Sequence, residues 1–470
     1  MGATLPSINR ALLRPANNQI ALIGHSMADN CMSLGISGGQ IRQILFHANV
    51  AGFISMLSKG RYTFPEDCKF AVGSTKTSDI ISTALTSTNR PNGVGVGFTQ
   101  LQMAVSCPAS IVFLWTGTND ASGGISLATT IANFRTILNT LTAAGKIVIL
   151  IGPTPRGSTA GTSFRLTGSQ LQILMALREW LVRQAPLLWP GLVYCVDLWT
   201  LFADLSSSAT AGDIVAADSY DQLHPSALGA WKIFQIALLM LDRLGLPGAF
   251  SQENTNGEAY DATNNPRGNL IPSAATQALL YGTGAAWSGT SGGAVFAGTK
   301  ASLLTSVLSG VAGSSAITFT GSMVTTSTGQ WWQIVVSGTS IAGSNQYTLL
   351  YFSNILRTNL NAGDKIAQFG EFEIDSGGVG LAGLAYVTQR STAAGTDTVA
   401  LGYGDGSKGA FDTILAAGML SGTWNGDQPT TISGDETVDI KNYFQINVMP
   451  STTVNFTFRV RNLAVRKTYP

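Results

Sequence analysis

The sequence predicts an α/β domain with a three-layer α/β/α parallel sheet, followed by an all-β antiparallel sandwich of jelly-roll type. In the first half, short apolar runs alternate with stretches of helical periodicity. Beyond about residue 300 the apolar period changes to two. All 3 histidines and all 4 cysteines lie in the first half. We expect an arm (1–17), the α/β domain (18–245), a linker (246–285) and the sandwich (286–470).

Composition limits the functions that this chain can have. Charged residues make up only 11% of the chain, the net charge is +1, and no run of Lys and Arg occurs, so no nucleic-acid partner is expected. No apolar run reaches the roughly 18 residues of a membrane span, so no membrane partner is expected either. Residues 1–15 lack the apolar core of a signal peptide. We expect a secreted or virion-associated protein, with a cytoplasmic location left open.

Metal and cofactor chemistry is not expected. The cysteines (Cys31, Cys68, Cys107 and Cys195) are widely spaced and form no CxxC pair. With so few histidines, the chain lacks the ligand clusters of a zinc site. We therefore predict no metal, no cofactor and reduced, structural cysteines.

The first predicted strand, Ile20–Ile23, is wholly apolar and runs into Gly24 and Ser26. Residues 39–59 have apolar positions at helical spacing and predict a helix. Lys69–Val72 reads as a short strand that stops at Gly73.

The remaining predicted elements continue the alternation of strands and helices. Strands are expected at 111–115, 147–151 and 192–196, and helices at about 127–144, 169–184 and 226–244. The strand at 111–115 ends in Gly117, Thr118, Asn119 and Asp120. Ligands of parallel sheets gather at the carboxyl ends of the strands, where Ser26, Gly73 and Asn119 fall.

A pair of polar residues precedes the last predicted helix. Asp221 stands three residues before His224, in a loop that leads to Pro225. An Asp at this spacing can accept a hydrogen bond from one imidazole nitrogen, which leaves the other nitrogen ready to take a proton from a serine. Asp218 is the alternative acid.

Together these motifs resemble the SGNH (GDSL-like) esterase/lipase family over residues 18–245. The resemblance implies a flavodoxin-like sheet, Ser26 as nucleophile, His224 as base and Asp221 as the residue that orients it. It also implies an oxyanion hole formed by the backbone N–H groups of Ser26 and Gly73 and the side chain of Asn119. The chain departs from the family in having His25 where Asp is usual, and Gln222 where Gly is common.

Four further residues are candidates for substrate contact, and each has a plainer interpretation. His25 can be a wall of the site, and Asp120 a turn residue. Arg156, like Arg165, lies in the Gly/Thr-rich loop after the fourth strand and can be a solvated charge. Trp331 can belong to the core.

In the C-terminal half, alternating residues such as Val454, Phe456 and Phe458 predict strands with one wet face. The predicted sandwich resembles jelly-roll carbohydrate-binding modules, in which exposed tryptophans would stack on sugars. The candidates are Trp287, Trp331, Trp332 and Trp424. An oligomerisation or attachment module, similar to trimeric phage tail-spike enzymes, is the rival interpretation.

We therefore expect a serine esterase that deacylates, and in particular deacetylates, an acylated carbohydrate. A lipase or general carboxylesterase is one alternative. A phage-tail-like adhesion or structural protein with an idle hydrolase fold is another, and as a homo-oligomer it would be a trimer. Residues 1–247 are expected to carry the whole chemical step.

Overall fold

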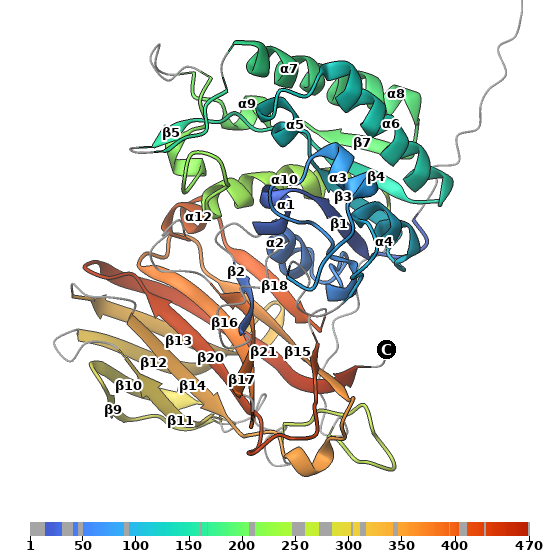
Figure 1. Cartoon of the computed structure of the whole chain (residues 1–470). Helices are drawn as coiled ribbons and strands as arrows, with labels where there is room; N and C mark the ends of the chain where they lie inside the picture. Colours follow the sequence, from blue (N-terminus) through green and yellow to red (C-terminus); the bar gives the residue numbers. More distant parts are fainter. Residues whose placement is uncertain are drawn as a thin grey trace, which may run out of the picture. The chain divides into compact units, whose positions relative to one another are not determined.

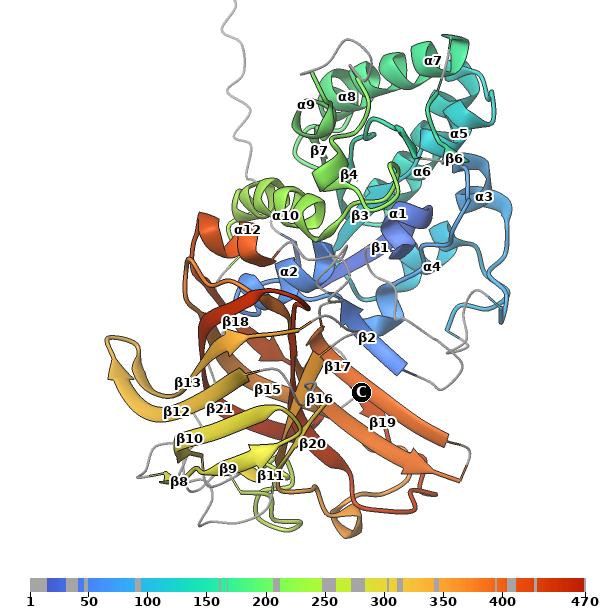
Figure 2. The ribbon, with the colours of Figure 1, turned by 90° about the vertical axis from the view of Figure 1, so that its left-hand side faces the viewer.

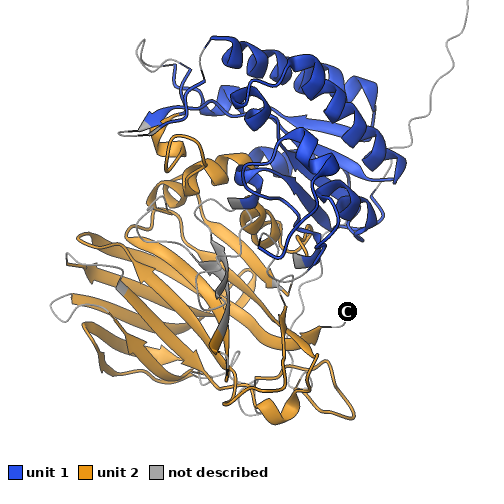
Figure 3. Ribbon diagram, in the orientation of Figure 1, with its two compact units in different colours: residues 1–29, 67–214, 235–247 blue, residues 30–66, 215–234, 248–470 orange. Residues whose placement is uncertain are grey.

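The structure is a computed structural model and describes residues 15–30, 41–45, 50–88, 94–159, 162–166, 168–205, 212–246, 259–271, 284–301, 304–310, 316–341, 346–393, 395–403, 411–426 and 429–468. The chain divides into two compact units that do not follow chain order (Figure 3). Unit 1 comprises residues 1–29, 67–214 and 235–247. Unit 2 comprises residues 30–66, 215–234 and 248–470. The predicted boundaries at 17, 245 and 285 stay predictions.

Unit 1 contains a four-stranded parallel sheet in the order β1 (Ile20–Gly24), β3 (Ile111–Trp115), β4 (Ile147–Ile151), β7 (Val193–Val196) (Figure 1). Every residue of β1, β3 and β4 is buried, which explains their uninterrupted apolar sequences. This confirms the predicted parallel sheet. Residues 69–72 run beside β1, where the N–H groups of Phe70 and Val72 donate to the carbonyls of Leu22 and Gly24.

The helices of unit 1 agree with the predicted alternation. One face of the sheet packs on Phe134, Ile137 and Leu141 of α6 and on Leu177 of α7. The helical elements are α1 (Ser26–Asn30), α3 (Thr77–Ser82), α4 (Gln100–Ser106), α5 (Thr118–Ser122), α6 (Leu127–Ala143), α7 (Gly168–Glu179), a π-helical turn (Trp180–Gln184), α8 (Ala185–Leu188) and α9 (Trp199–Phe202). A small hairpin pairs β5 (Ser158–Thr159) with β6 (Thr162–Ser163).

Unit 2 contains two large sheets that form a sandwich-like region (Figure 2). The first has the order β18 (Leu420–Asn425), β15 (Lys365–Ile374), β21 (Thr453–Thr468), β13 (Gly329–Thr339), β12 (Ala316–Thr326), β10 (Ala294–Lys300), β8 (Ala285–Ala286), with β19 (Thr430–Thr431) beside β15 and β9 (Gly289–Ser291) beside β10. The second has the order β11 (Leu304–Ser309), β14 (Gln346–Phe352), β20 (Lys441–Val448), β16 (Leu381–Thr392), β17 (Gly395–Tyr403), β2 (Ile41–Leu45).

Aromatic side chains from both sheets meet in the core of the sandwich. Trp424 of β18 packs against Tyr386 of β16 and Phe444 of β20, with ring centroids 5.2 and 5.4 Å apart. Trp332 of β13 meets Phe352 of β14 edge-on at 6.4 Å. The predicted period-two pattern is confirmed in β21, where alternate residues from Val454 to Val460 are buried.

One predicted helix of unit 2 is wrong in its first part. The predicted helix over 39–59 divides into the strand β2, parallel to β17, and the helix α2 (Val50–Leu57). Pairing with a strand far along the chain decided the conformation of residues 41–45, which local periodicity cannot reveal. In the predicted linker, Leu270 and Ile271 are buried, and the N–H of Leu270 donates to the carbonyl of Val465 in β21.

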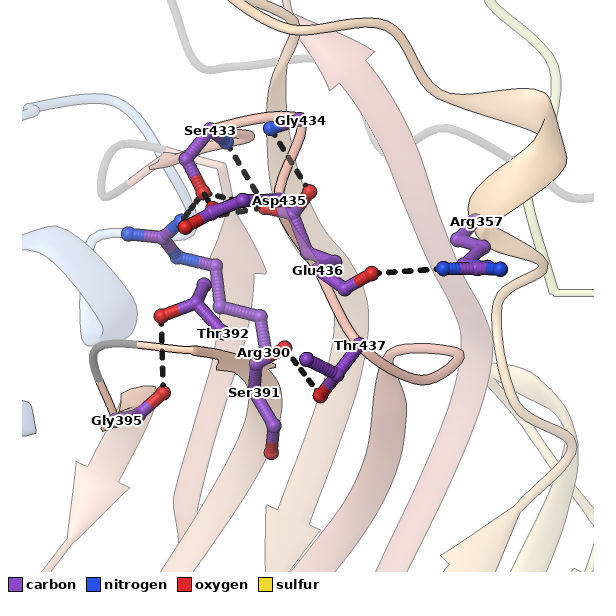
Figure 4. A network of polar contacts seen from close by, with 10 residues as sticks. All are labelled: Arg357, Arg390, Ser391, Thr392, Gly395, Ser433, Gly434, Asp435, Glu436 and Thr437. Atoms are coloured by element: carbon purple, nitrogen blue, oxygen red, sulfur yellow. Dashed lines mark hydrogen bonds and ion pairs between the residues drawn. The ribbon is translucent and has the colours of Figure 1, made fainter.

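A polar network closes one turn of unit 2 (Figure 4). The Glu436 carboxylate accepts hydrogen bonds from the N–H groups of Ser433 and Gly434, both at 2.9 Å, and from Arg390 of β16 at 3.2 Å. The carbonyl of Glu436 accepts a further hydrogen bond from Arg357 at 2.9 Å. The turn is thus tied to β16 by charge-assisted bonds.

The remaining helical segments are α10 (Ala227–Asp242), which the division between the units crosses, α12 (Phe411–Ala417), and short 3₁₀ turns at Glu66–Cys68, Ala216–Asp218 and Arg357–Asn359. Within the described residues, no helix is long and apolar enough to cross a membrane. The same part of the chain contains no group of three metal-ligating side chains. Cys68, Cys107 and Cys195 are free thiols, and Cys31 lies outside the described residues.

Candidate active site

The turn after β1 places Ser26 at the start of α1. Gly24 has φ +141°, and a Cβ at this position would lie 2.0 Å from the carbonyl oxygen of Trp115, so only glycine fits. The N–H of His25 donates to that carbonyl at 3.1 Å. Ser26 is half-buried directly after this turn, which agrees with its predicted position at the carboxyl end of the strand.

Thr75 connects the loop after residues 69–72 to the end of β1. Its hydroxyl donates to the carbonyls of Gly24 and Val72 at 2.8 and 3.0 Å. Its own carbonyl accepts a hydrogen bond from the side chain of Asn119 at 3.1 Å. The ends of β1 and β3 and the intervening loop therefore form one hydrogen-bonded assembly, and sequence analysis missed Thr75 because a loop threonine carries no motif signal.

The backbone of Gly73 is engaged by a carboxylate. Its N–H donates to Oδ2 of Asp29 at 3.1 Å. A backbone N–H has one proton to donate. The predicted oxyanion role of Gly73 therefore requires Asp29 to release this group, and it stays a prediction.

Asn119 is held from both ends of its amide. Its Nδ2 donates to the carbonyl of Thr75, and its Oδ1 accepts a hydrogen bond from Nη2 of Arg156 at 3.2 Å. Arg156 fixes which end of the amide is oxygen, so the second N–H of Nδ2 is available for another acceptor. Gly117, with φ +103°, is the N-cap residue that precedes α5, and Asn119 lies in the first turn of this helix.

Asp120 does not face solvent. It is fully buried, and its carboxylate accepts hydrogen bonds from the N–H and hydroxyl of Thr77, at 3.0 and 2.5 Å. Burial raises the pKa of this carboxyl, against the effect of the two bonds. The predicted substrate contact is therefore wrong: Asp120 anchors the first residue of α3.

Unit 1 contains a cavity of about 190 Å³ that is lined by Arg156, the hydrogen-bond partner of Asn119. Its polar lining includes Arg156, Arg165 and Asp213, and its apolar wall includes Leu166, Leu174 and Trp199. Leu166 and Leu174 form a small buried cluster with Ala121 of α5, which connects the wall to the helix that carries Asn119.

In unit 2, Asp221 and His224 form a hydrogen-bonded pair. Oδ2 of Asp221 lies 2.6 Å from Nδ1 of His224, while its Oδ1 accepts from the N–H groups of Leu223 and His224 at 2.9 and 2.7 Å. Burial opposes ionisation of Asp221, but these bonds outweigh it and lower the pKa of its carboxyl. The ring of His224 stacks on Tyr220 at 5.7 Å.

The structure distinguishes between the two candidate acids. Asp218 is fully buried and its Oδ2 forms an ion pair with Lys232 at 2.6 Å, so of the two carboxylates it is Asp221 that is hydrogen-bonded to the ring of His224. Gln222 has φ +68°, a conformation that glycine adopts without strain. This explains why glycine suits the position between Asp221 and His224.

Two other candidate contacts are buried. His25 is 1% exposed, and its Nδ1 accepts a hydrogen bond from the N–H of Met27 at 3.2 Å, while its interpretation as a wall of the site stays a prediction. Trp331 is 2% exposed and lies beneath the guanidinium of Arg461 at 4.4 Å, so it is not available to stack on a sugar. Trp287, Trp332 and Trp424 are buried as well.

The predicted catalytic residues therefore belong to two groups. Ser26, Gly73 and Asn119 lie in unit 1, and Asp221 with His224 lies in unit 2. Hydrogen bonds connect the groups of unit 1 through Thr75, and Asp221 is joined to His224 directly. The pairing of Ser26 with His224 stays a prediction.

No protein-family model matches the sequence, and no curated protein matches it either. Among solved structures, a candidate acylhydrolase from Bacteroides fragilis is 12% identical and covers 50% of this chain and 91% of its own, with a TM-score of 0.33. A member of the lipolytic G-D-S-L family from Veillonella parvula is 18% identical over 48% and 98%, with a TM-score of 0.31. A variant of an acetyl-xylooligosaccharide esterase from Geobacillus is 14% identical over 51% and 99%, with a TM-score of 0.31. Each of these matches extends over about half of this chain.

Proposed function

We propose that this protein is a serine ester hydrolase that deacetylates a carbohydrate through an acyl-enzyme, with Ser26, Asp221 and His224 as its triad. The observation that carries the proposal is the bond of 2.6 Å between Asp221 and Nδ1 of His224. With Nδ1 occupied by the carboxylate, Nε2 is the nitrogen that can accept a proton from a serine.

The proposed reaction has two balanced halves. The Oγ of Ser26 attacks the ester carbonyl carbon while His224 takes its proton, and the same proton leaves with the departing alcohol as the C–O bond breaks. Water then attacks the acyl-enzyme with His224 as base, and the carboxylic acid is released as Ser26 regains a proton. Asp221 stays ionised throughout and orients the imidazole.

Asn119 is suited to stabilise the tetrahedral oxyanion. Arg156 holds its amide oxygen and Thr75 accepts one N–H, so the remaining N–H is oriented before the substrate arrives. One such donor contributes about 3–4 kcal/mol in acyl-transfer sites. Because the amide of Asn119 is already held in place, this donor is effective as the charge develops.

The cavity lined by Arg156 favours a hydrophilic substrate over the lipase alternative. Two arginines and an aspartate contribute to its lining. A long alkyl chain there would remove charged groups from water without a compensating bond, which is unfavourable by several kcal/mol. A sugar hydroxyl can replace the lost water, so we propose a short acyl group on a polar alcohol.

Replacing the nucleophile tests this proposal. Ser26→Ala should abolish hydrolysis of an aryl acetate, and Ser122→Ala, at an exposed serine, should leave the rate unchanged. A serine-directed phosphonate should add its mass to the peptide that contains Ser26. Aryl acetate should be hydrolysed faster than aryl octanoate, and acetate should be released from acetylated polysaccharides. Labelling at another serine, or a Ser26→Ala protein with most of its activity, would refute the assignment.

A further inference from the structure

The cavity of unit 1 contains a buried cation without a partner of opposite charge. Arg156 is 7% exposed, and its one hydrogen bond within the described residues is the Nη2 bond to Asn119. Its Nε is buried and has no acceptor there. No carboxylate in the described part of the chain forms an ion pair with it, and the flanking segments 160–161, 167 and 206–211 contain no Asp or Glu.

The other arginine of the cavity is already neutralised. Arg165 forms a two-point interaction with Asp213, through Nε at 2.9 Å and through Nη2. The cavity therefore carries one uncompensated positive charge, at Arg156. Burial lowers the pKa of Arg156 to about 10, so the group is charged at neutral pH and bears the cost of its lost hydration.

An anion that enters the cavity would relieve this cost. A guanidinium binds carboxylates through paired N–H donors, and such charge-assisted bonds are strongest where water is excluded. A single uncompensated charge matches a monoanion, because the second charge of a phosphate monoester would have no cationic partner in the cavity. Leu166, Leu174 and the half-buried Trp199 provide the apolar surface that the ring of a sugar contacts.

We propose that this cavity is a substrate subsite for a carboxylate-bearing sugar, with Arg156 as its cationic partner, so that the substrate class is an acylated acidic saccharide. The proposal rests on the ester-hydrolase function proposed above and names its substrate. Arg156 acts in two ways, since it also positions the amide of Asn119. Its role in recognition must therefore be measured as a preference between substrates and not as a rate alone.

The test uses the full-length chain and two matched esters. One is an acetylated uronic acid with a free carboxylate, and the other is the same compound as its methyl ester. The wild-type protein should show a higher kcat/KM on the free acid, by about tenfold to a hundredfold, as expected for one bond to a charged group. Arg156→Gln should remove this preference, whatever it does to the rate on the neutral ester.

A double variant provides the matched control. Arg165→Gln with Asp213→Asn removes the neutral pair from the same cavity without changing its net charge, so the preference for the acid should persist. An equal loss on both esters in Arg156→Gln would show that Arg156 only positions Asn119, and would overturn the proposal. The proposal would also be overturned if the wild-type protein showed no preference between the two esters. A preference that appeared only for the sulfate-bearing analogue of the sugar, and not for the free acid, would overturn it as well.

A binding measurement separates this proposal from the proposed function. Free uronate should bind to the Ser26→Ala protein. It should bind only weakly to the double variant that carries Ser26→Ala and Arg156→Gln. Saturation-transfer NMR measures both. If no ester is hydrolysed but uronate binds through Arg156, the hydrolase proposal fails and the anion subsite stands. If esters are hydrolysed and uronate binding does not depend on Arg156, the subsite proposal alone fails.

Discussion

The bond between Asp221 and His224 makes the pH dependence of the proposed reaction predictable in sign. The carboxyl of Asp221 has a lowered pKa, so it stays ionised well below neutral pH. Its contribution to folding stability is present above the unfolded-state pKa of about 3.9 and is lost only as the pH falls through the lower folded value. A loss of activity near neutral pH is therefore not caused by protonation of Asp221.

We expect kcat/KM to fall as the pH decreases through the range in which histidines gain a proton, because only neutral His224 accepts the proton of Ser26. Asp221→Asn should lower kcat by orders of magnitude, because it removes the carboxylate that orients the ring. A pH-independent kcat/KM from pH 5 to 9, with chemistry rate-limiting, would contradict the histidine-base mechanism.

Gln222 offers a second test at the level of a single residue. Its φ of +68° is accessible to glycine, costs other residues about 1 kcal/mol or more, and is worst for β-branched side chains. Gln222→Gly should keep both kcat/KM and thermal stability, whereas Gln222→Val should lower kcat/KM because Asp221 and His224 lose their alignment. Equal activity in the two variants would show that backbone conformation at this position does not set the geometry of the pair.

At the level of elements, the turn that carries Glu436 should depend on the charge of that residue. Glu436→Gln removes the acceptor of Arg390 and weakens the bonds to Ser433 and Gly434, so the free energy of unfolding should fall by about 2–3 kcal/mol. The exposed neighbour Asp435 supplies the control, since Asp435→Asn makes the same change of charge and should cost less than about 1 kcal/mol.

The effect of Glu436 should also depend on pH. Burial opposes its ionisation, but the hydrogen bonds from Ser433 and Gly434 lower the pKa of its carboxyl. The stabilisation is therefore complete above the unfolded-state pKa of about 4.3 and disappears as the pH falls through the lower folded value. Urea denaturation of wild type and Glu436→Gln should give a difference at pH 7 that shrinks as the pH falls through the folded-state pKa of Glu436. A constant difference would indicate packing, not charge.

The elements differ in how far the sequence predicts them. Runs such as Ile111–Trp115 are buried on both faces, so their apolar composition alone identifies the strand. The polar residues that come directly after the run identify the turn at its end. Residues 41–45 become a strand because they pair with β17. Since β17 lies more than 350 positions further along the chain, no local pattern predicts this pairing. Similarly, Asp120 and Trp331 have residue types suited to a site, but their burial is decided by Thr77 and Arg461, which tertiary packing brings near.

On the scale of the whole molecule, chain order and compact units do not coincide. Residues 30–66, which lie between two parts of unit 1, belong to unit 2 with the sandwich. Strand β2 extends the sheet of β17, and α2 packs closely on β18: a Cβ at Gly422 would lie 2.8 Å from the carbonyl oxygen of Met56. The packing of residues 30–66 in unit 2 therefore changes what we expect of the fragment 1–247, which was predicted to suffice for the chemical step.

We now expect the fragment 1–247 to be poorly folded, because it keeps β2 and α2 but lacks the strands that they pair with and pack on. The isolated fragment should sediment as aggregates, bind a hydrophobic dye and hydrolyse aryl acetate far more slowly than the full chain.

The control is a full-length chain with a protease site at 251–257, cut after folding. The cut protein should stay associated under native conditions and keep its rate, since the contacts of β2 and α2 are intact although the chain is broken. A monodisperse fragment with close to the full rate would show that the chemical step does not need the sandwich. A cut protein that loses its rate would show that the site requires covalent connection and not packing.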